Sequence, residues 1–319
     1  MIRALALIVA LACAATAAAQ QYPAQAVKII VAFPPGGGAD IAARIVAQEL
    51  AQNTGQSFVV ENVAGAGGTI GTARAAQAAP DGYTLFVGTP STHGTNPAVY
   101  PKLAYDPVRD FAPIGLIGSS PFLLIAAPDL KVDSAAQLIA LARAHPGELN
   151  YASYGNGTIN HLVGELFSAL ADIKVSHVPY RGGAPAMTDL LAGRVQYTFD
   201  STAALGHIKT GRVKLLAVTS AKRWSVFPDV PTVAESGVPG FEAATWYGLF
   251  SPAATPASIV EQLNGKLNAA LQTPGAKAGL AKLSLDSGGG RPEVLGRIVQ
   301  AEIAKWTEIA RKRNIRIED

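Results

Sequence analysis

Residues 27–40 read VKIIVAFPPGGGAD, an apolar run that ends in a proline and glycine turn just before Asp40. The run Val27–Phe33 predicts a buried β-strand, and the apolar residues after Asp40 recur at the spacing of an amphipathic helix. Asp40 is read either as a plain N-cap of that helix or as a cap that also orients the glycine loop. The stretch is therefore predicted to be a strand–glycine–helix junction.

The same alternation of strand and helix signals continues along the rest of the chain. Such alternation predicts an α/β protein with parallel-type sheets covered by helices. Further strands are expected at 58–60, 83–87, 122–127, 149–153, 175–178, 195–199, 215–218 and 246–250, and the clearest helical stripes at 159–170 and 295–309.

The length of the chain favours two lobes. It has 319 residues, and a domain typically holds about 150. No Gly/Ser-rich or Pro-rich linker separates the halves, so the chain is expected to cross between lobes on strands, at Ile117–Pro121 and Ala244–Phe250. This predicts a discontinuous first lobe, residues 20–121 and 246–319, and a second lobe, residues 122–245.

The first twenty residues predict a secretory signal peptide. Arg3 precedes a short apolar run, and small residues ending at Ala19 follow it. The run is shorter than the roughly 20 residues of a membrane-spanning helix. Cleavage after Ala19 is therefore expected, leaving a periplasmic chain that starts near Gln20. Lipidation of Cys13 is the less favoured alternative, because the apolar region before this single cysteine is unusually short.

The charge of the chain argues against a nucleic acid partner. The formal net charge is +3, and it falls by one when Arg3 is removed. Nucleic acid binding calls for a basic patch or stripe, whereas these charges are evenly spread. The one basic cluster, residues 311–313, ends a helical pattern and complements its dipole. With a charged fraction of 15%, a compact, soluble monomer is expected.

Three strand–glycine–helix junctions carry the functional prediction: Phe33–Asp40, Ser153–Thr158 and Val178–Pro185. Glycine lets a ligand approach the backbone N–H groups, and the first turn of a helix offers unpaired N–H donors. Ligands of open α/β sheets bind beyond the carboxyl ends of the strands, where these loops are expected. Arg181 is the one cation in the three loops, so an anion held mainly by backbone groups is predicted.

The plainer alternative is that each glycine only makes a tight turn. Residues 65–71 are a fourth glycine-rich stretch, and we expect it simply to start a helix. Among the histidines, each is expected to be structural, with His161 the least certain because it falls in the first turn of the helix after Gly155.

Enzyme signatures are missing from the sequence. It has no G-x-G-x-x-G, P-loop, G-x-S-x-G or H-E-x-x-H motif, and its histidines show no metal-ligand spacing. No catalytic residue, metal site or cofactor is therefore expected.

Several motifs together resemble the Bug family, the periplasmic receptors of tripartite tricarboxylate transporters. They include the Phe33–Asp40 loop, Pro80–Leu85, His177–Ala186 and the long segment Ile208–Glu235, in the family's order and spacing. The resemblance covers nearly all of the chain after the signal peptide. It implies a type II periplasmic-binding-protein fold, in which two lobes close on a ligand cleft between them.

The resemblance also implies a small carboxylate ligand, held largely by backbone groups and ordered water, and permease subunits as partners. Two departures stand out: residues 205–207 read Leu-Gly-His where the family usually has Leu-Pro-His, and Tyr154 replaces a smaller residue. The ligand-binding residues carried over by motif are Phe33, Pro35, Gly36, Gly37, Gly38, Asp40, Thr89, Ser91, Ser153, Gly155, Gly157, Thr158, Arg181, Gly182, Gly183 and Asp200.

Three functions stay open from the sequence. The first is a binding receptor that delivers a dicarboxylate, amino acid or aromatic acid to a membrane permease. The second is a receptor of the same fold that presents its ligand to a sensor kinase. The third is a secreted enzyme, which the missing catalytic motifs make the weakest of the three.

Overall fold

The computed structural model describes residues 22–201 and 204–317. The predicted signal peptide, the cleavage after Ala19 and Cys13 lie outside the described residues. Within those two ranges, no helix is both long and apolar enough to cross a bilayer.

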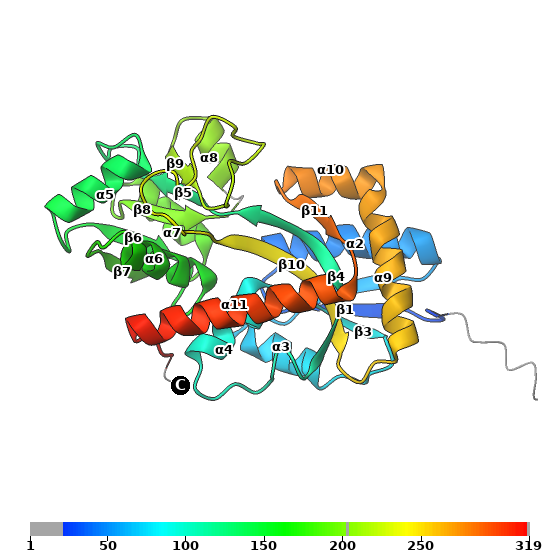
Figure 1. Cartoon of the computed structure of the whole chain (residues 1–319). Helices are drawn as coiled ribbons and strands as arrows, with labels where there is room; N and C mark the ends of the chain where they lie inside the picture. Colours follow the sequence, from blue (N-terminus) through cyan, green and yellow to red (C-terminus); the bar gives the residue numbers. More distant parts are fainter. Residues whose placement is uncertain (1–21, 202–203, 318–319) are drawn as a thin grey trace, which may run out of the picture.

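The first lobe is built on a six-stranded sheet in the order β11-β4-β10-β3-β1-β2 (Figure 1). Apolar stripes of α2 and α9 pack on it, with Val46, Leu50 and Leu267 fully buried. The strands are β1 (Val27–Val31), β2 (Phe58–Asn62), β3 (Thr84–Gly88), β4 (Phe111–Pro121), β10 (Ala244–Pro252) and β11 (Asp286–Gly289), and the helices are α2 (Gly38–Thr54), α3 (Thr69–Ala76), α9 (Ala257–Gln272) and α10 (Pro274–Lys282).

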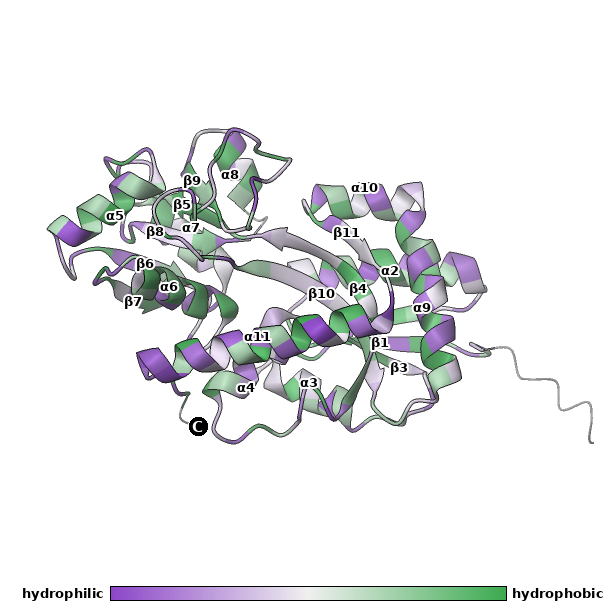
Figure 2. Cartoon of the chain, in the orientation of Figure 1, coloured by the Kyte–Doolittle hydropathy of each residue, from purple (hydrophilic) through white to green (hydrophobic). Residues whose placement is uncertain are grey.

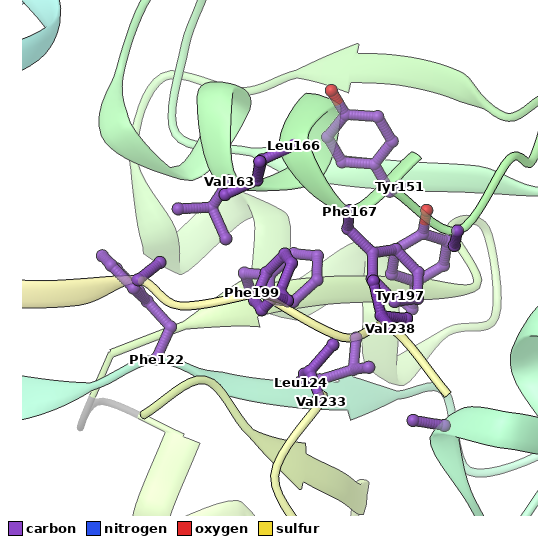
Figure 3. Close-up of a cluster of buried hydrophobic side chains, with 14 of the residues drawn as sticks. Phe122, Leu124, Tyr151, Val163, Leu166, Phe167, Tyr197, Phe199, Val233 and Val238 are labelled. Atoms are coloured by element: carbon purple, nitrogen blue, oxygen red, sulfur yellow. The ribbon is translucent and has the colours of Figure 1, made fainter. Parts of the chain in front are cut away.

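The second lobe is built on a five-stranded sheet in the order β7-β6-β8-β5-β9. Aromatic side chains fill its core, where Phe167 meets Tyr197 and Phe199 edge-on (Figure 3). The strands are β5 (Leu123–Ala126), β6 (Asn150–Ser153), β7 (Ser176–Pro179), β8 (Tyr197–Asp200) and β9 (Lys214–Val218), and the helices are α5 (Ala135–Ala144), α6 (Ile159–Leu170), α7 (Gly183–Leu191) and α8 (Leu205–Lys209).

Both sheets are mixed. The expected parallel pairing holds for β2-β1-β3 and for β7-β6-β8. The strands next to the crossings pair antiparallel, because β4 runs toward the other lobe and β10 returns from it. The expected α/β architecture with two lobes is confirmed.

The two crossing segments lie side by side. Ala244 pairs with Pro121 at the end of the β4–β10 ladder, and Phe122 is the one residue between β4 and β5. The backbone N–H of Phe122 donates to the hydroxyl of Thr219 at 2.7 Å, which ties the crossing to the residue after β9 of the second sheet.

The C-terminal helix α11 (Pro292–Arg313) connects the two cores (Figure 1). Leu295 and Val299 are buried beside Phe250 of the first lobe, whereas Trp306 and Ile309 belong to the core that holds Leu162. Hydrophilic and hydrophobic positions therefore alternate along its whole length (Figure 2). The π-helical turn η2 (Ser91–Thr95) and α4 (Asn96–Val99) pack against this helix, and the turn η1 (Ala66–Gly68) leads into α3 as expected.

Candidate functional site

Two of the strands that lead into the loops singled out in the sequence, β3 and β8, are paired with strands at the crossings. In the first sheet, Gly88 at the end of β3 pairs with Gly248, the middle residue of β10. In the second sheet, Asp200 at the end of β8 pairs with Leu123, the first residue of β5. Because the parallel neighbours β1, β6 and β7 end at the same edges, the loops after them face the region between the lobes.

Asp40 organises the glycine loop of the first lobe. Helix α2 starts at Gly38 and its N-cap is Gly37, so Asp40 is the third helical residue and the plain N-cap reading is wrong. Its carboxylate instead accepts a hydrogen bond from the Gly36 N–H at 2.9 Å. Arg44 pairs with the same carboxylate at 2.9 Å. These bonds hold the pKa of Asp40 below its usual value, although burial acts in the opposite direction.

Asn62 at the end of β2 completes this network. Its amide donates to the Phe33 carbonyl and to the Asp40 carboxylate, both at 3.0 Å. The loop is therefore held from both sides, while Gly36 and Gly37 themselves stay exposed to solvent. The backbone N–H groups at the start of α2 donate no hydrogen bond to an N-cap side chain, because the N-cap is a glycine.

Tyr247 of β10 lies directly against this helix end. Its hydroxyl occupies the space that a β-carbon on Gly38 would need. The tyrosine is buried, and burial raises its pKa. The crossing strand thus brings a phenol hydroxyl to the N-terminus of α2.

Thr89 lies just before the π-helical turn that follows β3, and Ser91 is the first residue of that turn. Both side chains are buried. The Thr89 N–H donates to the Thr92 hydroxyl at 3.0 Å, and Thr92 in turn contacts Nδ1 of His93 at 3.0 Å. Turns of this kind are rare and often occur at functional sites. His93 is fully buried among phenylalanines, which lowers its pKa to about 3 and keeps it neutral.

Two stacked histidines hold the glycine loop of the second lobe. The rings of His161 and His177 lie 3.9 Å apart and nearly parallel. Nδ1 of His161 accepts from the Gly157 N–H at 3.1 Å, and Nε2 of His177 hydrogen-bonds the Ser153 hydroxyl at 2.6 Å. Burial is the main cause of the lowered pKa of both histidines, and the pKa of His177 falls to about 4.

Half-buried Tyr154 and buried Asp200 form a pair at the same sheet edge. The Tyr154 hydroxyl donates to Asp200 Oδ2 at 2.5 Å, and the Ala204 N–H donates to Oδ1 at 3.2 Å. The Tyr154 ring lies over Gly183, where a β-carbon would come within 3.1 Å of it. Burial, then the Asp200 charge, and then Tyr247 raise the pKa of Tyr154 well above its usual value.

The junction after β7 is the most open of the three. Arg181 is exposed, and Gly182 has a φ of 110°, a backbone conformation that favours glycine. Gly182 is the N-cap of α7 and Gly183 its first residue. The expected cation therefore lies at the rim of the region and not inside it.

Gly155 and Gly157 differ in what surrounds them. At Gly155, an added β-carbon would meet only ordinary contacts, at 3.6 Å. At Gly157 it would come within 3.0 Å of Val99 and 2.9 Å of Ile317, and the Gly157 carbonyl accepts from the Thr95 hydroxyl at 3.0 Å. Gly157 thus faces the first lobe and the C-terminal segment, and Thr158 at the start of α6 turns its hydroxyl back to the Gly155 carbonyl.

Two residues of this arrangement did not emerge from the sequence: Tyr247 and Asn62 in its role as a clamp. Tyr247 stands inside an apolar strand, where nothing in the sequence marks which aromatic ring faces the loops.

A surface hollow of about 270 Å³, lined by residues that include Leu130 and Gln196, shares no residue with these loops.

Comparison with known proteins places this arrangement among solute-binding proteins. The chain has 40% identity and a TM-score of 0.85 to the structure of "R. palustris Rpa4515 with adipate", covering 92% of this chain and 99% of that one. It has 37% identity and a TM-score of 0.80 to "MatC (Rpa3494) from Rhodopseudomonas palustris with bound malate", covering 90% and 99%. BugT of Bordetella pertussis is 36% identical over 96% of this chain and 94% of its own.

Two α/β lobes joined by crossing strands, with helices that follow glycine loops at the facing edges, are the arrangement of a two-lobed solute-binding protein. The family model described as "Tripartite tricarboxylate transporter family receptor" matches residues 42–315. The chain belongs to this family of solute-binding receptors, as the sequence motifs predicted.

Proposed function

We propose that this chain captures a small carboxylate in the cleft between its lobes and delivers it to the permease subunits of a tripartite transporter. The observation that carries the proposal is the set of three helices, α2, α6 and α7, that follow the glycine loops at the two facing sheet edges. Each presents backbone N–H donors and the positive end of its dipole to an anion.

The side chains around these helix ends fit a binding surface whose one exposed charge outside the Asp40–Arg44 ion pair is a rim cation, since the carboxylate of Asp200 is buried. Arg44 is engaged by Asp40, and Arg181 is exposed. Hydroxyl groups of Tyr154 and Tyr247 lie among the helix ends and offer neutral hydrogen bonds. A ligand with one or two carboxylates matches such a surface, and the related structures with adipate and malate support this ligand class.

The transporter partner, the periplasmic location and the absence of catalysis follow from the family and stay part of the proposal. So do the lobe limits, residues 20–121 with 246–319 and residues 122–245, and the set of ligand-binding residues taken from the motifs. The related structure of "periplasmic binding protein BugD", 34% identical over 93% of this chain, supports the location.

A thermal-shift panel tests the proposal: succinate, L-malate, adipate, L-glutamate and benzoate. An acid at about 100 times its dissociation constant stabilises the bound state by roughly 2.7 kcal/mol. For domains of this size the melting temperature is expected to rise by roughly 5–10 °C. Small-angle scattering is expected to show compaction with the same acid. A folded protein that none of the five acids stabilises would contradict the proposal.

A further inference from the structure

Asp200 is a buried carboxylate at an edge that otherwise favours anions. It ends β8, next to the crossing at Leu123, and only 1% of its surface is exposed. Its two oxygens are bound by neutral donors, the Tyr154 hydroxyl and the Ala204 N–H. Among residues 22–201 and 204–317, no cationic side chain forms an ion pair with it.

The other titratable groups on the elements packed against β8 are engaged elsewhere. On α6, Glu165 accepts from Arg313 at 2.7 Å, and His161 is bound to Gly157. On α7, Asp189 is bound by the Tyr180 hydroxyl and by Arg194, both at 2.8 Å. From β10, Tyr247 raises the pKa of Tyr154, and it is not among the groups that shift the pKa of Asp200. The environment of Asp200 thus leaves its charge uncompensated.

We propose that Asp200 is the proton-binding residue of the ligand cleft, so that capture of a carboxylate anion is accompanied by uptake of one proton on Asp200. The inference rests on the proposed function. The proton settles on Oδ2, whose new O–H then donates to the Tyr154 oxygen. The Tyr154 hydroxyl, which donates to Asp200 in the free protein, is released and donates to the ligand carboxylate.

The short Tyr154–Asp200 contact allows this reversal without movement of heavy atoms. The separation of 2.5 Å suits a hydrogen bond in either direction. The Tyr154 ring already lies over Gly183 at the start of α7, one of the three helix ends proposed to hold the anion. Tyr154 therefore couples the protonation of Asp200 to the ligand carboxylate.

The sign of the coupling follows from the charges. Burial raises the pKa of Asp200 to about 6, against the lowering effect of its two hydrogen bonds. A second negative charge beside it raises the pKa further in the complex. Affinity is therefore expected to be constant below about pH 6 and to fall as the pH rises from the free to the bound pKa, by at most about tenfold per pH unit.

Calorimetric titration with L-malate and with adipate tests this between pH 5.5 and 8, in phosphate and in Tris buffer. For the wild type, we expect the apparent enthalpy at pH 7 to differ between the buffers in the sense of proton uptake. Asp200→Asn imitates the protonated carboxyl, and because the ligand itself titrates equally with both proteins, comparing the variant with the wild type removes the ligand's own contribution. The variant is expected to bind with little pH dependence and more tightly than the wild type at pH 8.

Asp189→Asn is the matched control, because Asp189 also pairs with a tyrosine but has Arg194 as a counter-ion. It is expected to keep the proton uptake of the wild type. Weaker binding by Asp200→Asn at every pH would overturn the inference and leave the proposed function intact. The same buffer dependence of the enthalpy in the wild type and in Asp200→Asn would do so as well. If neither acid binds the wild type or Asp200→Asn, the proposed function fails and the inference with it.

Discussion

The hydroxyl of Tyr247 fills the space beside Gly38 that a β-carbon would need. Tyr247 belongs to the strand that returns from the second lobe, and Gly38 is the first residue of α2. The contact therefore fixes the start of a proposed anion-binding helix against the crossing between the lobes. The close approach of Tyr247 is what requires a glycine at position 38. Its backbone conformation does not, because its φ is not in the left-handed region.

Gly38→Ala is expected to destabilise the fold, because the buried tyrosine has little room to move. Overpacking of this kind costs about 1–3 kcal/mol. The double variant with Tyr247→Phe is expected to recover part of the loss, since the hydroxyl is the closest atom, and chemical denaturation of all four chains measures the coupling. Equal stability of Gly38→Ala and the wild type would contradict the contact.

The sequence predicted the junctions and crossings but not every strand around them. Short strand signals followed by a glycine turn identify β1, β6 and β7, because period and turn chemistry are local. Strand β11 escaped prediction because Asp286–Gly289 has no apolar run. It pairs with β4 through glycines, and a β-carbon on Gly288 would collide with the Leu116 carbonyl.

The side-chain network of the site was harder to predict. The sequence could place Asp40 and Asp200 near the loops. Whether such a carboxylate caps a helix or holds a loop in place depends on residues far away in the chain. Asn62 and Tyr247 reach Asp40 and Gly38 only once the sheet has formed. Tertiary pairing of this kind leaves no periodic signal.

The stacked histidines are expected to make the protein less stable in acid. Both are held neutral, with the pKa of His177 lowered to about 4, whereas an unfolded histidine titrates near about 6.5. The unfolded chain therefore binds more protons, and stability falls as the pH drops from about 6.5 toward 4, by at most about 1.4 kcal/mol per unit for each histidine. Urea denaturation of the wild type and His177→Gln at several pH values measures the slope. A variant that keeps the full slope would argue against this assignment.

The C-terminal helix is expected to contribute to both lobes. Trp306 is fully buried in the core that also holds Leu162, and its indole N–H donates to Glu302 at 2.7 Å. Trp306→Ala is expected to cost about 3–5 kcal/mol of unfolding free energy. Lys312→Ala, on the exposed side of the same helix, is expected to change it by less than about 0.5 kcal/mol. Similar denaturation midpoints for the two variants would contradict the packing of α11.

Gly37 and Arg181 separate backbone recognition from recognition by a cation. A β-carbon on Gly37 would meet only the Pro34 carbonyl, at 3.7 Å, so the fold tolerates a side chain there. Gly37→Val is therefore expected to fold normally, as circular dichroism can show, and to obstruct the approach of a ligand to the start of α2. Arg181 is exposed, and a screened rim charge is worth about 0–1 kcal/mol.

The most direct measurement is calorimetric titration of the wild type, Gly37→Val and Arg181→Ala with the acid that gives the largest thermal shift. If backbone N–H groups and helix ends hold the carboxylate, Gly37→Val loses most of its affinity, while Arg181→Ala loses at most about fivefold, the equivalent of about 1 kcal/mol. Loss of binding in Arg181→Ala with nearly unchanged binding in Gly37→Val would contradict the account and identify a salt bridge in its place.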